Sequence, residues 1–281
     1  MKAILVKCFF ISCLTVILIG CNTAPKRFSE NNIQFDSLLV SKTYHFFDVD
    51  SNPKCSLQIN FVYPIDYSNK DVLRLVQQQF LSAFFGEDYS TLSPNEAAEQ
   101  YADNFIVAYK AMEKDFKTVI EQHDMEINEM WYAHDESATC EIVFNRNDLL
   151  SLAVYKEYFS GGAHGGHNYT NRVIELKTGR RILEDDIFID DYQDDLANII
   201  VDAIALSHNV EIVELENIGF FNVDEIFPNN NFYADETGLT YTYNEYEIAA
   251  YVVGAVSVQI PYDKIRHLLR RESPLSEIAF R

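Results

Sequence analysis

Residues 139–176 read TCEIVFNRNDLLSLAVYKEYFSGGAHGGHNYTNRVIEL. Apolar residues alternate with polar ones in three runs of this stretch, 139–145, 150–159 and 168–176. A repeat of two residues indicates β-strands, and the short polar or glycine-rich turns between the runs favour pairing of neighbours. With the preceding strand candidate 126–133, the runs 139–145 and 150–159 predict an antiparallel meander, and 168–176 is the next predicted strand.

The rest of the chain adds helices that do not alternate with these strands. Asn69 is a predicted helix N-cap, and Ser93 to Glu96 form a capping box before an apolar stripe that extends to Ile120. Further predicted strands are 42–47, 55–63, 126–133, 231–234, 239–243 and 256–260, and further predicted helices are 194–207 and 261–269. Because helices and strands are segregated, we predict an α+β fold with antiparallel sheets packed against helices.

The first residues, MKAILVKCFFISCLTVILIGC, have the pattern of an export signal. Lys2 and Lys7 form the positively charged start of such a signal. The apolar run that follows them is too short to span a bilayer, and it ends in a lipobox at Cys21. We expect a lipoprotein signal peptide over 1–20, acylation of Cys21 and a lipid-anchored tether over 21–40. The alternative is an uncleaved anchor helix that begins near Met1.

The remainder of the chain is large enough for a substantial core, with about 245 residues after the polar segment that follows Cys21. We expect two associated subdomains, residues 41–148 and 149–281. Acyl chains on Cys21 would hold them at a membrane of the bacterial cell envelope without spanning it. Asn22, in a position where Asp directs retention, favours the outer membrane.

The chain is strongly acidic. Its formal net charge is −21, and removal of Lys2 and Lys7 with the signal peptide would give −21 − 2 = −23. Such a surface repels nucleic acid and anionic lipid headgroups, so nucleic acid is excluded as a partner. It suits a basic partner or divalent cations, although solubility alone also accounts for it.

Two cysteines remain beyond the signal and the lipidated residue. Cys55 and Cys140 each begin an alternating apolar pattern, so both sulfurs are expected on the buried face of a strand. An exported compartment permits a disulfide. Two alternatives stay open: a bridge between Cys55 and Cys140, or two separate buried thiols.

Two further segments carry a resemblance to a known family. One is YFSGGAHG at 158–165, followed by Thr178-Gly179 and LEDDIF at 183–188; the other is GLTYTYNEYEIAAYVVGAVSVQIPYDKI at 238–265. Together they resemble the C-terminal extracytoplasmic domain of RsiV-type anti-sigma factors, a domain of unknown function that also occurs in PdaC-type peptidoglycan deacetylases. The resemblance covers about 150–269, and 41–145 is similar to the companion domain upstream. The family often has proline beside the Tyr-Glu-Ile-Ala run, where this chain has Glu245 and Ala250.

This resemblance implies a binding module. RsiV-type proteins have a cytoplasmic sigma-binding segment and a membrane span, and PdaC-type enzymes have a separate deacetylase domain with a metal-binding aspartate and paired histidines. Neither arrangement is evident in this sequence, which leaves the shared extracytoplasmic module as a stand-alone lipoprotein. In the RsiV family that module recognises lysozyme.

The glycine-rich stretch is the first candidate site. His164 and His167 are close enough in sequence for both rings to reach one ion, but zinc needs a third protein ligand, which only Asp185 or Asp186 would supply through folding. The alternatives are a loop that contacts a partner and a turn for which Gly161-Gly162 and Gly165-Gly166 provide positive φ. The turn is the preferred interpretation, and we expect no metal and no cofactor.

An acidic run and a group of tyrosines are the other candidates. The acidic run lacks the spacing of a calcium loop and is typical of a helix N-terminus, or of a docking patch for a basic protein. The tyrosines indicate core and rim, or a surface that stacks on sugar rings. The run comprises Glu184, Asp185, Asp186, Asp190, Asp191, Asp194 and Asp195, and the tyrosines are Tyr241, Tyr243, Tyr246 and Tyr251.

The sequence thus predicts a lipid-anchored envelope protein that binds a ligand without catalysis of its own. The expected ligand is lysozyme or another basic envelope component, and the candidate contact residues are His164, His167, Asp185, Asp186, Asp190, Asp191 and Tyr246. The alternative is a peptidoglycan-directed enzyme, or an accessory to one, with its site near the GGAHGGH loop. No G-x-S-x-G nucleophile motif is present.

Overall fold

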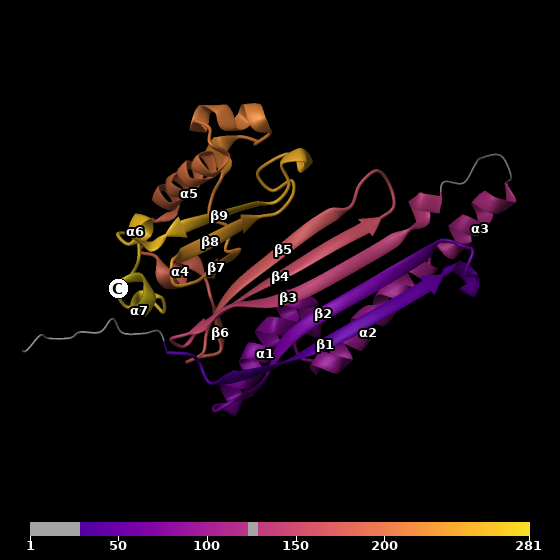
Figure 1. Ribbon diagram of the computed structural model, residues 1–281, viewed down its shortest axis with the longest axis horizontal. Coiled ribbons are helices and arrows are strands. Elements are labelled where there is room, and N and C mark those ends of the chain that lie inside the picture. Colours follow the sequence, from indigo (N-terminus) through magenta and orange to yellow (C-terminus); the bar gives the residue numbers. More distant parts are fainter. Residues whose placement is uncertain (1–28, 123–128) are drawn as a thin grey trace, which may run out of the picture.

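The computed structural model describes residues 29–122 and 129–281, which form an α+β fold with two β-sheets (Figure 1). The predicted fold class is therefore confirmed. The predicted signal peptide and the lipidation site Cys21 lie outside the described residues. In the described part of the chain no single helix is long and apolar enough to cross a membrane, and the one pair of helices that passes by length and composition, 193–208 with 212–218, is bent by 63°.

The first sheet has the strand order β1-β2-β3-β4-β5-β6. Neighbouring strands pair antiparallel, except that β2 and β3 are parallel. The predicted strands 139–145, 150–159 and 168–176 are confirmed as β3, β4 and β5 of an antiparallel meander, to which β6 adds a short strand that was not predicted. The strands are β1 (Ile33–His45), β2 (Lys54–Tyr67), β3 (His134–Arg146), β4 (Leu149–Ser160), β5 (Gly166–Glu175) and β6 (Arg180–Ile182).

Strand β1 begins earlier than the sequence predicts. Ile33 pairs with Tyr67 and is buried, so residues 33–40, which we had assigned to the tether, belong to the sheet. The predicted boundary between 148 and 149 falls inside the β3–β4 hairpin, so the first sheet combines strands from both expected subdomains. The pairing of adjacent strands, and not the predicted limits, decides which residues belong to this sheet.

Helices α1 (Lys70–Phe84), α2 (Pro94–Lys110) and α3 (Glu113–Glu121) connect β2 to β3. The side chain of Asn69 caps α1, and Ser93 with Glu96 forms the predicted capping box of α2. The predicted single helix to Ile120 is broken, because the amide of Met112 bonds the carbonyl of Tyr109 in a tighter turn before α3 begins. The predicted strand 126–133 is also wrong where it is described, since Glu129–Tyr132 forms a 3₁₀ turn.

One face of the first sheet packs against α1 and α2 (Figure 1). Alternate residues of β4, Leu150, Leu152 and Val154, point to this face and are fully buried, as the period of two requires. The opposite face is apolar at one end, where Phe144, Leu149 and Val173 belong to the core under the second sheet, and polar toward the β4–β5 loop. A row of directly paired residues, Gln58, Ser137, Glu157 and His167, crosses it from β2 to β5.

Both remaining cysteines are buried and free, so the disulfide that we left open is not formed. Cys55 pairs with His134 across the parallel joint, whereas Cys140 lies six residues further along β3, about 20 Å away. A disulfide requires Cα atoms no more than about 7 Å apart. Burial raises the pKa of the Cys55 thiol to about 11 and that of Cys140 to about 12, so both are inert thiols.

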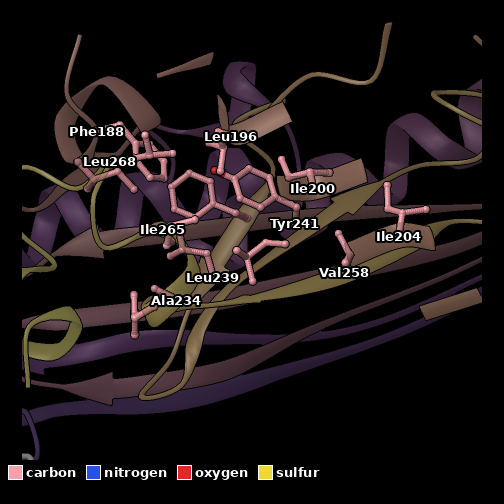
Figure 2. Packing of buried hydrophobic residues seen from close by; sticks show 14 of the residues in the cluster. Phe188, Leu196, Ile200, Ile204, Ala234, Leu239, Tyr241, Val258, Ile265 and Leu268 are labelled. Carbon is pink, nitrogen blue, oxygen red and sulfur yellow. The ribbon is translucent and has the colours of Figure 1, made fainter. Parts of the chain in front are cut away.

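The second sheet has the order β7-β8-β9, and its core lies between the sheet and α5 (Figure 2). Leu196 and Ile200 of the helix face Leu239 and Tyr241 of β8, and all four side chains are fully buried. The second unit consists of α4 (Glu184–Ile187), α5 (Gln193–His208), β7 (Phe232–Ala234), β8 (Gly238–Tyr243), β9 (Val256–Pro261), α6 (Tyr262–Ile265) and α7 (Ser276–Ala279), with 3₁₀ segments η4 (Ile212–Ile218), η5 (Val223–Glu225) and η6 (Tyr251–Val253).

Side chains of the second unit close the part of the β5 edge that β6 leaves unpaired. Glu245 accepts the amide of His167 at 3.1 Å, and Asn244 accepts the amide of Tyr169 at 2.6 Å. Asn231 accepts the amide of Asn171 at 2.7 Å. The second sheet is thus fixed to the first by polar contacts with backbone groups at every second residue of β5.

Candidate binding cleft

The loop 161–165 joins β4 to β5, and its first two glycines adopt conformations that other residues rarely take. Gly161 has φ 81° and Gly162 has φ 94°, which confirms the predicted glycine turn. Gly165 and Gly166 do not have positive φ, so that part of the prediction is wrong. They are required for another reason: a Cβ at either would lie 2.6 Å from an atom of Tyr158.

Substitution of Gly161 by alanine should be more harmful than substitution of Gly162. Both changes place alanine at positive φ, which costs about 1–2 kcal/mol. A Cβ at Gly161 would also lie 2.4 Å from the carbonyl oxygen of Trp131, whereas nothing lies within 4 Å of one at Gly162. Denaturant unfolding should therefore show a larger loss of stability for Gly161→Ala, by about 1 kcal/mol or more. Equal losses would contradict the contact with Trp131.

His164 is exposed but held in place. Its ring stacks on Tyr251 with 4.0 Å between the ring centroids, and its Nδ1 lies 2.9 Å from the carbonyl oxygen of Gly165. The hydroxyl of Tyr251 donates to the same oxygen at 3.0 Å. The loop is thereby attached to η6 of the second unit.

His167 is bound by a largely buried carboxylate. Its Nδ1 lies 2.6 Å from Oε1 of Glu245, whose side chain is 9% exposed, and its Nε2 lies 4.0 Å from Oε1 of Glu157. The ring is also parallel to Tyr155. Glu245 therefore holds both the backbone and the ring of His167, and it fixes the start of β5 beside the turn 244–247.

Two adjoining hollows lie beside this loop, and we call them together the His-loop cleft. Their volumes are about 230 and 450 Å³. The smaller is rimmed by Tyr246, which is 58% exposed and stacks 5.8 Å from Tyr251. The larger extends over the polar face of the first sheet, where Asp135 and Glu157 present their carboxylates, whereas the carboxylate of the neighbouring Glu136 accepts from Tyr101 of α2 on the other face. The lining residues that the structure describes include no lysine or arginine.

The acidic run lies elsewhere. It follows β6, at the end of the sheet opposite the β4–β5 loop (Figure 1), and none of its residues lines the cleft. Asp186 caps the amide of Leu183, Asp185 accepts from the hydroxyl of Tyr192, and Asp190 pairs with Arg270 at 2.8 Å. Asp191 is exposed in a left-handed conformation with φ 60°. The structure thus brings together His164, His167 and Tyr246, but not the four aspartates predicted beside them.

Glu184 of the same run is an internal residue with 3% exposure. Its carboxylate accepts the amide of Asn230 at 2.7 Å, and the amide of Glu184 bonds the Asn230 side chain in return. Burial raises the pKa of this carboxyl above its ordinary value. The charged form is therefore less favourable in the folded than in the unfolded chain.

The pH dependence of Glu184→Gln should reveal this burial. Because the folded pKa is raised, the contribution of Glu184 to stability is greatest when the group is protonated and is lost as pH rises above about 4.5. Glutamine keeps an acceptor for Asn230 without ionising. Unfolding free energies measured from pH 4 to 7 should show the variant gaining relative to the wild type as pH increases. A difference that is constant, or that falls with pH, would contradict the assignment.

The cleft offers little for metal chemistry. In residues 29–122 and 129–281, no group of three or more His, Cys, Asp and Glu side chains is placed to hold a metal ion. Nδ1 of His164 bonds the carbonyl oxygen of Gly165, and its ring stacks on Tyr251. Nδ1 of His167 bonds the carboxylate of Glu245. Asp185 and Asp186, the predicted third ligands, bond to Tyr192 and Leu183 instead.

Sequence reasoning missed the acidic lining of the cleft. Glu157 lies directly opposite His167 in the β4–β5 hairpin, and this pairing follows from the loop length once the strand ends are known. Glu245 comes from a distant turn, and no local pattern signals its contact. Tyr251 was predicted only as one of four tyrosines, of which Tyr241 and Tyr243 are core residues.

Comparisons with known proteins agree with this architecture. Residues 185–263 match the family model described as a protein of unknown function, DUF3298, and residues 50–167 match the model described as deacetylase PdaC. No curated protein gives a significant match. Each model covers less than half of the chain, and the PdaC match ends at His167, the second residue of β5.

Solved structures extend the similarity to most of the chain. A crystal structure of a DUF3298 family member from Bacteroides fragilis NCTC 9343 has a TM-score of 0.82 at 27% identity, covering 89% of this chain and 98% of that chain. A DUF3298 family protein from Pseudomonas aeruginosa PAO1 has a TM-score of 0.58 at 12% identity, covering 86% of this chain and 96% of that chain, and shows likeness of fold alone. The chain therefore contains a PdaC-type and a DUF3298-type segment joined in the fold of a DUF3298 family structure.

Proposed function

We propose that this protein is a lipid-anchored binding protein of the bacterial cell envelope, without catalysis of its own, whose His-loop cleft takes a basic protein of the lysozyme class. One observation carries the proposal: the cleft combines Asp135, Glu157 and Glu245 with no lysine or arginine among its described lining residues. The resemblance to RsiV-type domains supports the choice of ligand. Acylation at Cys21 and an outer-membrane location remain part of the proposal.

The physical case rests on charge and on rigid aromatic groups. Carboxylates in a cleft attract a cationic partner and raise its rate of association. Tyr246 and Tyr251 present large, stacked rings at the rim, and aromatic residues of this kind contribute strongly to protein interfaces. The fixed positions of His164 and His167 mean that little conformational freedom is lost on binding.

The alternative is a role in peptidoglycan chemistry. The match of residues 50–167 to a deacetylase model and the exposed rim tyrosines favour a glycan ligand. Binding without turnover is preferred because both described cysteines are buried and the described residues include no group of three or more metal-ligating side chains. A changed muropeptide profile after incubation with peptidoglycan would instead support an enzyme.

The decisive measurement is binding of the full-length chain in detergent to an animal-type lysozyme, at low and at physiological salt. We expect saturable binding that survives physiological salt. A double variant, Asp135→Asn with Glu157→Gln, should weaken it at least about tenfold, since each charge contact is worth roughly 1 kcal/mol.

A matched variant separates the cleft from the acidic run. Asp191→Asn with Asp194→Asn removes the same charge from exposed residues outside the cleft, and Asn tolerates the left-handed conformation of Asp191. It should reduce affinity by less than about twofold at physiological salt, because distant exposed charges are screened. Equal losses for the two double variants would show non-specific attraction, and no binding at all would remove lysozyme as the ligand.

A further inference from the structure

A second groove lies between α5 and the outer edge of β9. It has a volume of about 450 Å³ and shares no residue with the His-loop cleft. Ile199, Ala203 and Leu206 line its helical side, and Leu206 is 81% exposed. Its other side is the strand itself, Ser257 to Pro261. The groove therefore joins an apolar helix stripe to the backbone of an edge strand.

The register of β9 shows which backbone groups face this groove. The amide of Tyr262 bonds the carbonyl of Thr237. Gly238 and Pro261 are therefore a non-hydrogen-bonded pair, in which the backbone polar groups of each residue point away from the other strand. Alternation along the ladder gives Gln259 and Ser257 the same orientation. Their N–H and C=O groups thus point to the open edge, and Pro261 has no N–H to leave unpaired.

This edge lacks the protection that the edge of β5 has. On β5, Glu245, Asn244 and Asn231 accept the free amides. Among the described residues, no group outside β8 bonds the backbone of Ser257 or Gln259.

We propose that the α5–β9 groove binds an extended segment of another polypeptide, which adds as a strand to β9 and inserts alternate apolar side chains against α5. Free backbone groups on an edge strand select an extended main chain, and the pockets beside it select side chains. From Ile199 to Ala203 the helix rises about 6 Å, which is close to the about 7 Å between two side chains placed two residues apart on a strand. Asp202 and Lys264 line the groove with opposite charges, and the net charge of −21 for the whole chain favours basic residues at the ends of the segment.

The test uses a defined probe, the capped peptide acetyl-Lys-Val-Thr-Val-Thr-Val-Lys-amide, titrated calorimetrically into the full-length chain. Two further peptides carry N-methyl groups on both threonines or on the first two valines. Only one set of amides can face β9, so one methylated peptide should bind about tenfold more weakly than the other, as expected for two lost hydrogen bonds. Hydrogen exchange should slow at Ser257 and Gln259 when the unmodified peptide binds.

Leu206→Asp should weaken binding about tenfold, because it places a charge where an apolar side chain docks. Val213→Asp is the matched control, since Val213 is 84% exposed and lies outside the groove. Equal binding of the two methylated peptides, equal effects of the two variants, or no binding would overturn the proposal. Concentration-dependent dimerisation that Leu206→Asp abolishes would also overturn it, because a second copy would then occupy the edge.

Discussion

Replacement of Phe46 by alanine is expected to destabilise the protein by about 3–5 kcal/mol, the range for removal of a fully buried phenylalanine. Phe46 has no exposed surface, and its ring stacks on Tyr109 with 4.4 Å between centroids. It also contacts Phe116 and Tyr132 at 5.1 and 5.9 Å. Tyr109, Phe116 and Tyr132 come from α2, α3 and the 3₁₀ turn before β3. The ring of Phe46 therefore holds the end of the helical connection between β2 and β3 against the sheet.

The neighbouring residue provides the control. Phe47 is 44% exposed, so Phe47→Ala should cost less than about 1 kcal/mol. Denaturant unfolding measures both losses, and hydrogen exchange in α3 should accelerate only for Phe46→Ala. If the two alanine variants were equally stable, the aromatic cluster would not contribute as the packing indicates.

Replacement of Asn231 by alanine is expected to cost about 2–4 kcal/mol. The side chain accepts the amide of Asn171 at 2.7 Å and donates to the carbonyls of Tyr169 and Thr242 at 3.0 and 2.9 Å. Alanine would remove three hydrogen bonds, at roughly 1 kcal/mol each, and would leave the amide of Asn171 without a partner, whereas the carbonyls of Tyr169 and Thr242 still accept from Asn244 and Asn229. The contact between the sheets would loosen, so hydrogen exchange should increase at Asn171 and also in the neighbouring turn 244–247.

Asn231→Asp tests the roles of the acceptor and the donors separately. Aspartate still accepts from Asn171 but cannot donate to Tyr169 and Thr242, and it places a charge beside their carbonyls. We expect a loss at least as large as that of alanine at pH 7 and a smaller loss at acidic pH, where the carboxyl can donate. A harmless aspartate would show that the donor contacts are not important.

The sequence predicted those elements whose signals are local. The capping box at Ser93, the cap at Asn69 and the alternation in β4 and β5 depend on residues within a few positions, and the structure has all of them. The limits of β1 were not predictable in the same way. Residues 33–40 have Ile33, Phe35, Leu38 and Val40 packed on the core, but the spacing of three between Phe35 and Leu38 breaks the period of two and hides the strand.

The candidate site was predictable only in part, for the same reason. The glycine loop and its histidines stand out in sequence, but the carboxylate that fixes His167 comes from Glu245, far along the chain. The acidic run was misleading because clustering in sequence does not imply a shared surface. Glu184 is internal, while Asp185 and Asp186 serve local contacts at the start of α4.

The single parallel joint between β2 and β3 has a consequence for the order of assembly. The β1–β2 hairpin and the β3–β6 meander can each form from neighbours in sequence, whereas the joint requires α1, α2 and α3 to have brought distant segments together. Closure of so long a connection is slow compared with hairpin formation. The β1–β2 hairpin and the β3–β6 meander would therefore form first, each with an unpaired edge, at β2 and at β3. Pairing of these two edges would then limit the folding rate, and the risk of aggregation is greatest while they remain unpaired.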